Sequence, residues 1–417
     1  MIDAIRAYLA DRRDPMLAAI ARLVDVNSHT ENIAGGARVA EMLAAELASI
    51  PGVSVRTVAS DRFAPHLVAT TRAAADSAEG AIAIIGHHDT VFPPGTFEGF
   101  RLDGDLARGP GVLDMKGGLV TAIEALRALS VAGLLDRAKV RFVIVSDEEV
   151  GSPESQPILR RELAGAACAL VLEAGRAADK IITARKGTGS AKVVASGKAA
   201  HAGNAHDKGA NAIWALARFI DRAQGFTDYA RGVTVNVGKI GGGQSKNTVP
   251  DQAECVLDFR FVSLADGEAT IAALRTAATE AAASVPGTSL TVDGGPARMP
   301  LERTDANVAL YREYAAHARA AGLGDGEAAL LGGGSDASTT SAIGIPSIDG
   351  LGPRGSGFHT KDELIENRVA RAQGRGHGRL HRGADRLTPH HAVRGRCAGC
   401  PRRPACRARA RRRFGLA

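Results

Sequence analysis

The sequence predicts an α/β protein with a mixed, mainly parallel sheet, helices on both faces of that sheet, and an inserted β-α-β-β-α-β domain. Short, fully apolar runs such as residues 81–86 and 140–146 alternate with stretches of helical periodicity. Such runs are typical of strands that are buried on both faces. Between residues 187 and 297 the order changes to strand, helix, strand, strand, helix, strand, which is a split βαβ pattern.

The elements of the first part, residues 1–186, follow from these periodicities. Apolar residues recur at helical spacing around residues 17–24 and 39–47, which predicts two amphipathic helices. The expected elements that follow are strands at 53–58, 66–70 and 81–86, a helix at 115–132, and strands at 140–146 and 169–173.

The inserted part and the segment after it are assigned in the same way. Its expected elements are a strand at 190–196, a helix at 210–223, strands at 234–240 and 253–261, a helix at 268–283 and a strand at 289–292. After Pro300 the first pattern resumes, with a helix near 306–321 and a strand at 346–350. The expected division is 1–186 and 298–369 for one domain, 187–297 for the insertion and 370–417 for a tail.

Composition excludes several classes of protein. Of the 417 residues, 45% are hydrophobic and 23% charged, which is ordinary for a globular protein and excludes a fully disordered or fibrous chain. No apolar run reaches the ~18 residues that a membrane span needs, and the first residues lack an apolar signal core. We therefore expect a cytoplasmic protein without a membrane partner.

The net charge of +7 comes from one segment. Residues 368–417 hold 15 of the 52 Lys and Arg residues but only one of the 45 acids, so the rest carries 37 bases against 44 acids. The body is thus acidic, and its charge gives no reason to expect that it binds nucleic acid.

Acids and histidines stand where the expected strands end. His87 follows residues 81–86, the doublet Glu148-Glu149 follows 140–146, and Glu173 ends the run at 169–173. In open α/β sheets ligands bind outside the carboxyl ends of the strands, so these side chains are expected to converge.

Two further candidates lie in Gly-rich turns, Asp114 ahead of a helix and His359 late in the chain. Together, two histidines and three carboxylates suit a pair of zinc ions bridged by one carboxylate. Glu148, beside Glu149, offers a general base that is not itself a ligand. Asp89 shares a face with His87 in an extended segment and is expected to orient it, while His88 points away.

Taken singly, each of these features has an ordinary structural explanation. Asp114 is placed like a helix N-cap, the Glu doublet like a solvated turn and Glu173 like an exposed strand end. Their joint occurrence at successive strand ends, with glycines around them, favours a metal site.

Four segments resemble the zinc exopeptidase family of acetylornithine deacetylase, succinyl-diaminopimelate desuccinylase and glutamate carboxypeptidase. They are His-His-Asp-Thr-Val at 87–91, the Gly-rich stretch at 109–118, Asp-Glu-Glu-Val-Gly-Ser at 147–152 and Gly-Phe-His-Thr at 357–360. The resemblance covers about residues 13–366. Residues 332–337 and 350–352 resemble the glutamate carboxypeptidase branch in particular.

The resemblance implies a role for each candidate. Asp114 would bridge two zinc ions, for which Co²⁺ is a possible substitute, and a cis peptide bond would follow it. The implied ligands are His87 and Glu173 for one ion, and Glu149 and His359 for the other. Glu148 would be the general base, and Asp89 would hold His87.

In the inserted domain, the resemblance implies a lid and dimerisation function and hence a homodimer. His201, in Ala-His-Ala-Gly at 200–203, would stabilise the oxyanion across the dimer interface. Asn247, in the loop at 241–251, and Gly334 would contact the substrate, and Arg260 would bind its α-carboxylate. Without the resemblance, His201 is typical of a turn and Arg260 of an ion pair on a strand face.

The expected function is hydrolysis of an amide bond in a small acylated amino acid or peptide, with release of a free amino acid, glutamate being favoured. The alternative is an N-acyl amino acid deacylase of the acetylornithine or succinyl-diaminopimelate type.

The C-terminal segment departs from the family pattern. A closing helix is expected to begin at residues 362–369, and then the pattern stops. The tail is expected to be disordered or an out-of-frame translation, because it is too rich in Gly and Arg for a stable helix or a core. Two alternatives are nonspecific nucleic-acid binding and a metal site at Cys397, Cys400 and Cys406.

Overall fold

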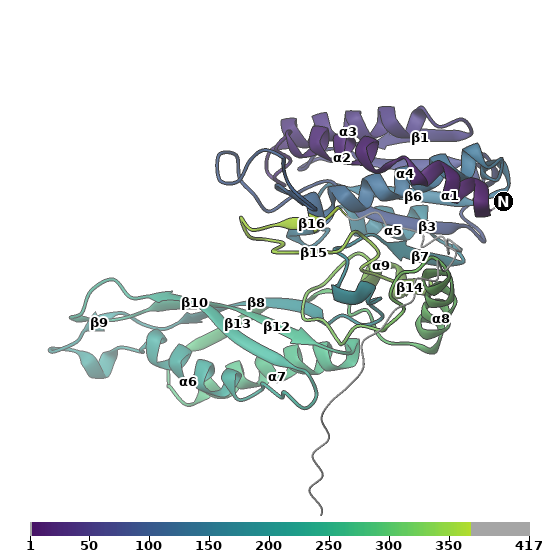
Figure 1. Ribbon diagram of the computed structural model, residues 1–417. Coiled ribbons are helices and arrows are strands. Elements are labelled where there is room, and N and C mark those ends of the chain that lie inside the picture. Colours follow the sequence, from purple (N-terminus) through teal and green to yellow (C-terminus); the bar gives the residue numbers. More distant parts are fainter. Residues whose placement is uncertain (1, 368–417) are drawn as a thin grey trace, which may run out of the picture. The chain divides into compact units, whose positions relative to one another are not determined.

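The computed structural model describes residues 2–367, and the expectations for residues 370–417 lie outside that range. Its largest sheet has the strand order β1-β2-β6-β3-β7-β14 (Figure 1). The neighbours β6, β3, β7 and β14 run parallel, whereas β1 pairs antiparallel with β2 and β2 with β6. The strands are β1 (Val53–Val58), β2 (His66–Thr71), β3 (Ile82–His87), β6 (Val140–Val145), β7 (Cys168–Val171) and β14 (Ser347–Ile348).

Helices cover both faces of this sheet, because successive side chains of a strand point to opposite faces. On β6, Phe142 and Ile144 pack with α2, α3 and α4, whereas Val143 and Val145 pack with α5 and α9. The helices of this domain are α1 (Ile2–Ala10), α2 (Arg13–Val24), α3 (Ile33–Ala48), α4 (Gly117–Val131), α5 (Ser155–Glu162), α8 (Asp305–Ala320) and α9 (Ala337–Ser341).

The inserted segment forms a second, antiparallel sheet with the order β10-β12-β8-β13. Buried and exposed residues alternate along β8, so one face of this sheet packs on two helices and the other faces outward. Phe219 of α6 and Leu274 of α7 lie in that core. The elements are β8 (Gly187–Ser196), α6 (Ala212–Gln224), β10 (Thr234–Gly242), β12 (Gln252–Phe261), α7 (Leu264–Ala283) and β13 (Ser289–Arg298).

Two small sheets complete the described part of the chain. One pairs β9 (Ala200–His201) with β11 (Thr248–Val249). The other has the order β15-β16-β5-β4, formed by β4 (Arg101–Asp103), β5 (Leu106–Arg108), β15 (Gly355–Ser356) and β16 (Leu364–Glu366).

The helix expected to begin at residues 362–369 is wrong for the part that the structure describes. Residues 364–366 form strand β16 instead, which pairs with β5 and β15. Ile365 is buried in the main core, and the Glu363 side chain is turned into a cluster of backbone N–H groups. These long-range contacts outweigh the local helical tendency of the segment.

The expected fold class is confirmed: a mixed, mainly parallel sheet with a separate β-α-β-β-α-β domain. The domain boundaries at residues 187 and 297 remain proposals. Among residues 2–367, no helix combines the length and the apolar character that crossing a bilayer requires.

Candidate active site

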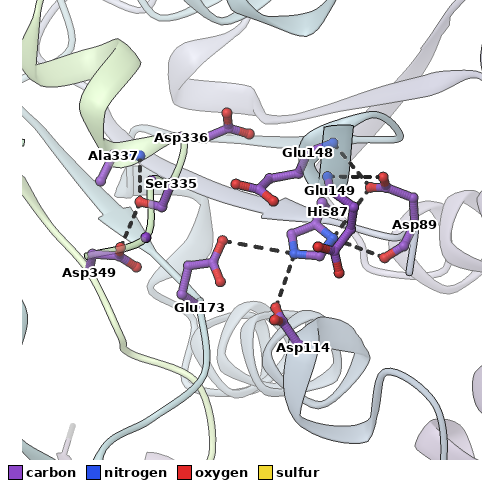
Figure 2. Close-up of polar contacts among 12 residues, drawn as sticks. His87, Asp89, Asp114, Glu148, Glu149, Glu173, Ser335, Asp336, Ala337 and Asp349 are labelled. Atoms are coloured by element: carbon purple, nitrogen blue, oxygen red, sulfur yellow. Dashed lines mark hydrogen bonds and ion pairs between the residues drawn. The ribbon is translucent and has the colours of Figure 1, made fainter. Parts of the chain in front are cut away.

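Three strand ends of the main sheet carry the core of the site. His87 is the last residue of β3, Glu148 and Glu149 begin the short helical turn after β6, and Glu173 stands two residues after β7. Because β3 lies between β6 and β7 and runs parallel to both, the carboxyl ends of these strands meet at one edge (Figure 2).

Two turns bring the remaining candidates to this edge. Asp114 lies in the turn Val112–Lys116 ahead of α4, and its peptide bond to Met115 is cis, as the resemblance implies. His359 lies between β15 and β16 with a φ of 62°, in the left-handed region that few non-glycine residues adopt. The structure therefore joins five side chains from five separate segments.

The two oxygens of Asp114 face two different histidines. Its Oδ1 lies 3.2 Å from His87 Nε2, and its Oδ2 lies 3.3 Å from His359 Nε2. Glu173 Oε1 lies 3.8 Å from the same nitrogen of His87, and Glu149 Oε2 lies 3.1 Å from that of His359. The result is two sets of one imidazole and two carboxylates, and Asp114 belongs to both.

Burial and mutual repulsion make this cluster of acids unfavourable by itself. Burial and the charge of Asp114 raise the pKa of Glu149 to about 7, against the lowering effect of its hydrogen bond with His359. Burial, with Asp114 and Glu148 nearby, raises the pKa of Glu173 well above its usual range. Burial also raises the pKa of Asp114, but hydrogen bonds with His359 and His87 outweigh it and the net shift is downward. A cation among these groups would relieve the repulsion, so the donor set fits a pair of divalent metal ions.

Asp89 connects the two sides of the site. Its backbone carbonyl oxygen lies 3.0 Å from His87 Nδ1, and its Oδ1 lies 3.4 Å from the same nitrogen. Its carboxylate also accepts hydrogen bonds from the backbone N–H groups of Glu148 and Glu149 and from Thr30 Oγ1. Asp89 thus holds the histidine ring and the Glu doublet together.

His88 is buried and turned away from the donor set. Its Nε2 contacts the carbonyl oxygen of Pro65. Burial lowers the pKa of its ring to about 4.

Glu148 is held by a residue that sequence reasoning missed. Arg298, the last residue of β13, is buried and donates to Glu148 Oε1 at 2.5 Å and to the Glu148 carbonyl oxygen at 3.2 Å. It also donates to Ser152 Oγ, which in turn donates to Asp336. No sequence signal marks Arg298, because it follows a Gly-Gly-Pro segment about 150 residues away from the acid that it meets.

Glu363 is a second residue that sequence reasoning missed. Its fully buried carboxylate accepts from the backbone N–H groups of Gly111, Leu113 and Asp114 at 2.9 to 3.1 Å. It therefore anchors the turn that presents Asp114. Its position four residues after His359 is the only signal that could have drawn attention to it.

The residues expected from the inserted domain have local contacts. His201 on β9 is exposed and accepts from the backbone N–H groups of Gly203 and Asn204 through Nδ1. The carbonyl oxygen of Asn247 accepts from the N–H of Ala202, so the loop before β11 lies beside His201.

Two residues expected to bind substrate also have intramolecular partners. Arg260 pairs through Nε with Asp258 on the same strand. Gly334 leaves room for Arg298, since a Cβ there would lie 2.5 Å from Arg298 Cδ. Its carbonyl oxygen also faces Arg185.

The fold and this donor set define a metallohydrolase. Residues 183–286 match the peptidase dimerisation domain of M20 enzymes, and residues 66–230 match peptidase family M28. Carboxypeptidase G2 of a Pseudomonas species is 27% identical over 362 residues, which cover 85% of this chain and 86% of that enzyme. Acetylornithine deacetylase of Myxococcus xanthus is 34% identical over 200 residues, 44% of this chain and 50% of that one.

Solved structures agree. The aminopeptidase PepT of Bacillus cereus superposes with a TM-score of 0.69 at 25% sequence identity, over 85% of this chain and 94% of that one. The chain belongs to the M20 exopeptidase family and is an enzyme of its metallopeptidase and amidohydrolase type.

Proposed function

We propose that the protein is a di-zinc exopeptidase that hydrolyses an amide bond and releases a C-terminal amino acid, with glutamate as the preferred one. The observation that carries the proposal is the position of Asp114 between two imidazoles, each with a further carboxylate. The similarity to carboxypeptidase G2 over most of both chains supports the glutamate preference.

Each half of the site would hold one zinc ion. We assign His87, Glu173 and one oxygen of Asp114 to the first, and His359, Glu149 and the other oxygen of Asp114 to the second. A zinc pair, when bound, would supply Lewis-acid polarisation of the scissile carbonyl and a lowered pKa for an attacking water.

Glu148 is the proposed general base. Its carboxylate lies with His87 and Glu173 in a group whose ligand-type atoms are all within 4.8 Å of one another. From there it would accept the proton of the attacking water and then deliver it to the leaving nitrogen. Asp89 would keep His87 Nε2 directed toward the site by holding Nδ1.

We propose Arg260 for the α-carboxylate of the released amino acid and Asn247 for the adjoining part of the substrate. Asp258 engages Nε of Arg260, and the terminal nitrogens are the part of a guanidinium that grips a carboxylate as a fork.

The substrate preference is tested with the full chain loaded with zinc. We expect release of glutamate from N-acyl-glutamates and glutamyl-terminated dipeptides to exceed turnover of N-acetylornithine and N-succinyl-diaminopimelate. Removal of metal with a chelator should abolish this activity, and added zinc should restore it. Preferential turnover of N-acetylornithine would favour the deacylase alternative, which the similarity to acetylornithine deacetylase supports.

We also propose a homodimer through the inserted domain, in which the partner subunit's His201 donates to the developing oxyanion. We expect Glu148→Gln and His201→Ala to be inactive as homodimers. A co-expressed mixture should regain about a quarter of the activity, since random pairing gives half hybrids and each hybrid has one intact site. Each single variant, isolated with the same tags, is the control. An inactive mixture of confirmed heterodimers would show that His201 acts within its own chain or not at all.

A further inference from the structure

We propose that Arg298 is the positioning residue of the general base: it fixes the carboxylate and the backbone of Glu148 so that the base faces the metal donors. The inference rests on the proposed role of Glu148. It assigns a function to the last residue of the inserted domain's final strand, β13 (Ser289–Arg298).

The geometry is that of a built seat for one guanidinium. Arg298 Nη1 donates to Glu148 Oε1, and Nη2 donates both to the Glu148 carbonyl oxygen and to Ser152 Oγ. The side chains of Arg298 and Glu148 are only 7% and 9% exposed. A guanidinium that grips the carboxylate and the main chain of the same residue removes the rotational freedom that a single contact would leave.

The surroundings of Arg298 are arranged to hold it in turn. Ser152 Oγ donates to Asp336 Oδ1, and the same oxygen of Asp336 lies 3.6 Å from Arg298 Nη2. On the opposite side, the missing side chain of Gly334 makes space for the aliphatic part of Arg298, because a Cβ would come within 2.5 Å of Cδ. Gly334 therefore acts as part of the seat and not as a substrate contact.

A fixed base matters because misplacing a catalytic group by about 1 Å can cost ~100-fold in rate. Glu148 also belongs to the group of ligand-type atoms formed with His87 and Glu173, so it is directed toward the donor set while Arg298 holds it. The position of the base is thus set from the strand that leaves the inserted domain.

The test uses Arg298→Met, which keeps the apolar stem, and Arg298→Lys, which keeps the charge but not the fork. We expect Arg298→Met to lower kcat by about 100-fold with little change in KM and with the wild-type zinc content, and Arg298→Lys to recover only part of kcat. Gly334→Ala, which crowds the same seat, should lower kcat in the same manner. Arg127→Met is the matched control, because Arg127 pairs with Glu124 and Glu46 on another face of the domain.

Three results would overturn the inference: unchanged kcat in Arg298→Met, a rise in KM alone, or a loss of zinc. If the wild-type chain hydrolyses none of the amides, the proposed function fails separately. The pair itself is then tested by the unfolding midpoints of Arg298→Met, Glu148→Gln and the double variant. Coupling is expected, because removal of one partner leaves the other buried and unpaired. Additive effects would refute the pairing.

Discussion

Replacement of Glu148 by Gln is expected to lower kcat for amide hydrolysis by about 10³-fold while the chain keeps its metal and its fold. Gln has the shape of Glu but cannot accept the proton of the attacking water. The neighbouring Glu149 keeps its contact with His359, so the donor set stays intact. The measurement is kcat and KM together with zinc content by emission spectroscopy.

Glu154→Gln is the control for Glu148→Gln. Glu154 lies in the same loop, but its carboxylate accepts from Ser60 and the N–H of Asp61, outside the donor set. Its variant should keep the wild-type kcat. A Glu148→Gln protein with full zinc and full rate would show that another group is the base.

Replacement of Glu363 by Ala is expected to weaken both the fold and the metal site. It leaves the N–H groups of Gly111, Leu113 and Asp114 without their shared acceptor, and each buried unpaired donor costs about 1–3 kcal/mol. We therefore expect the free energy of unfolding to fall by about 3 kcal/mol or more. Zinc affinity should fall by about 10–100-fold, because the turn that holds Asp114 loses its anchor.

Urea unfolding of the metal-free chain and zinc titration by calorimetry measure these two effects separately. Glu366→Ala is the matched control, since Glu366 lies on the same strand, is partly exposed and contacts Arg354. Unchanged zinc affinity in Glu363→Ala would show that the turn keeps its shape without the carboxylate.

The main sheet and its ligand-bearing ends could be predicted from the sequence because the signals are local. An apolar run followed directly by His87 or by Glu148-Glu149 places the side chain at a strand end, and parallel strands align those ends. Asp114 and His359 needed the family resemblance as well, because each lies in a Gly-rich turn whose direction local sequence does not determine.

The residues that support the site could not be predicted in this way. Glu363 acts on a turn about 250 residues earlier in the chain, and Arg298 on an acid 150 residues earlier. The strand at 364–366 was mistaken for a helix for the same reason, since its pairing with β5 is a long-range contact. Tertiary contacts of this kind have no local periodicity to reveal them.

The central claim is that Asp114 joins two metal sites, and the most direct test is the zinc content of the full chain. Native mass spectrometry of the dialysed protein should show two zinc ions per chain, and Asp114→Ala should reduce the bound zinc to one or none. A wild-type chain that binds a single zinc ion, or an Asp114→Ala variant that still binds two, would contradict the account.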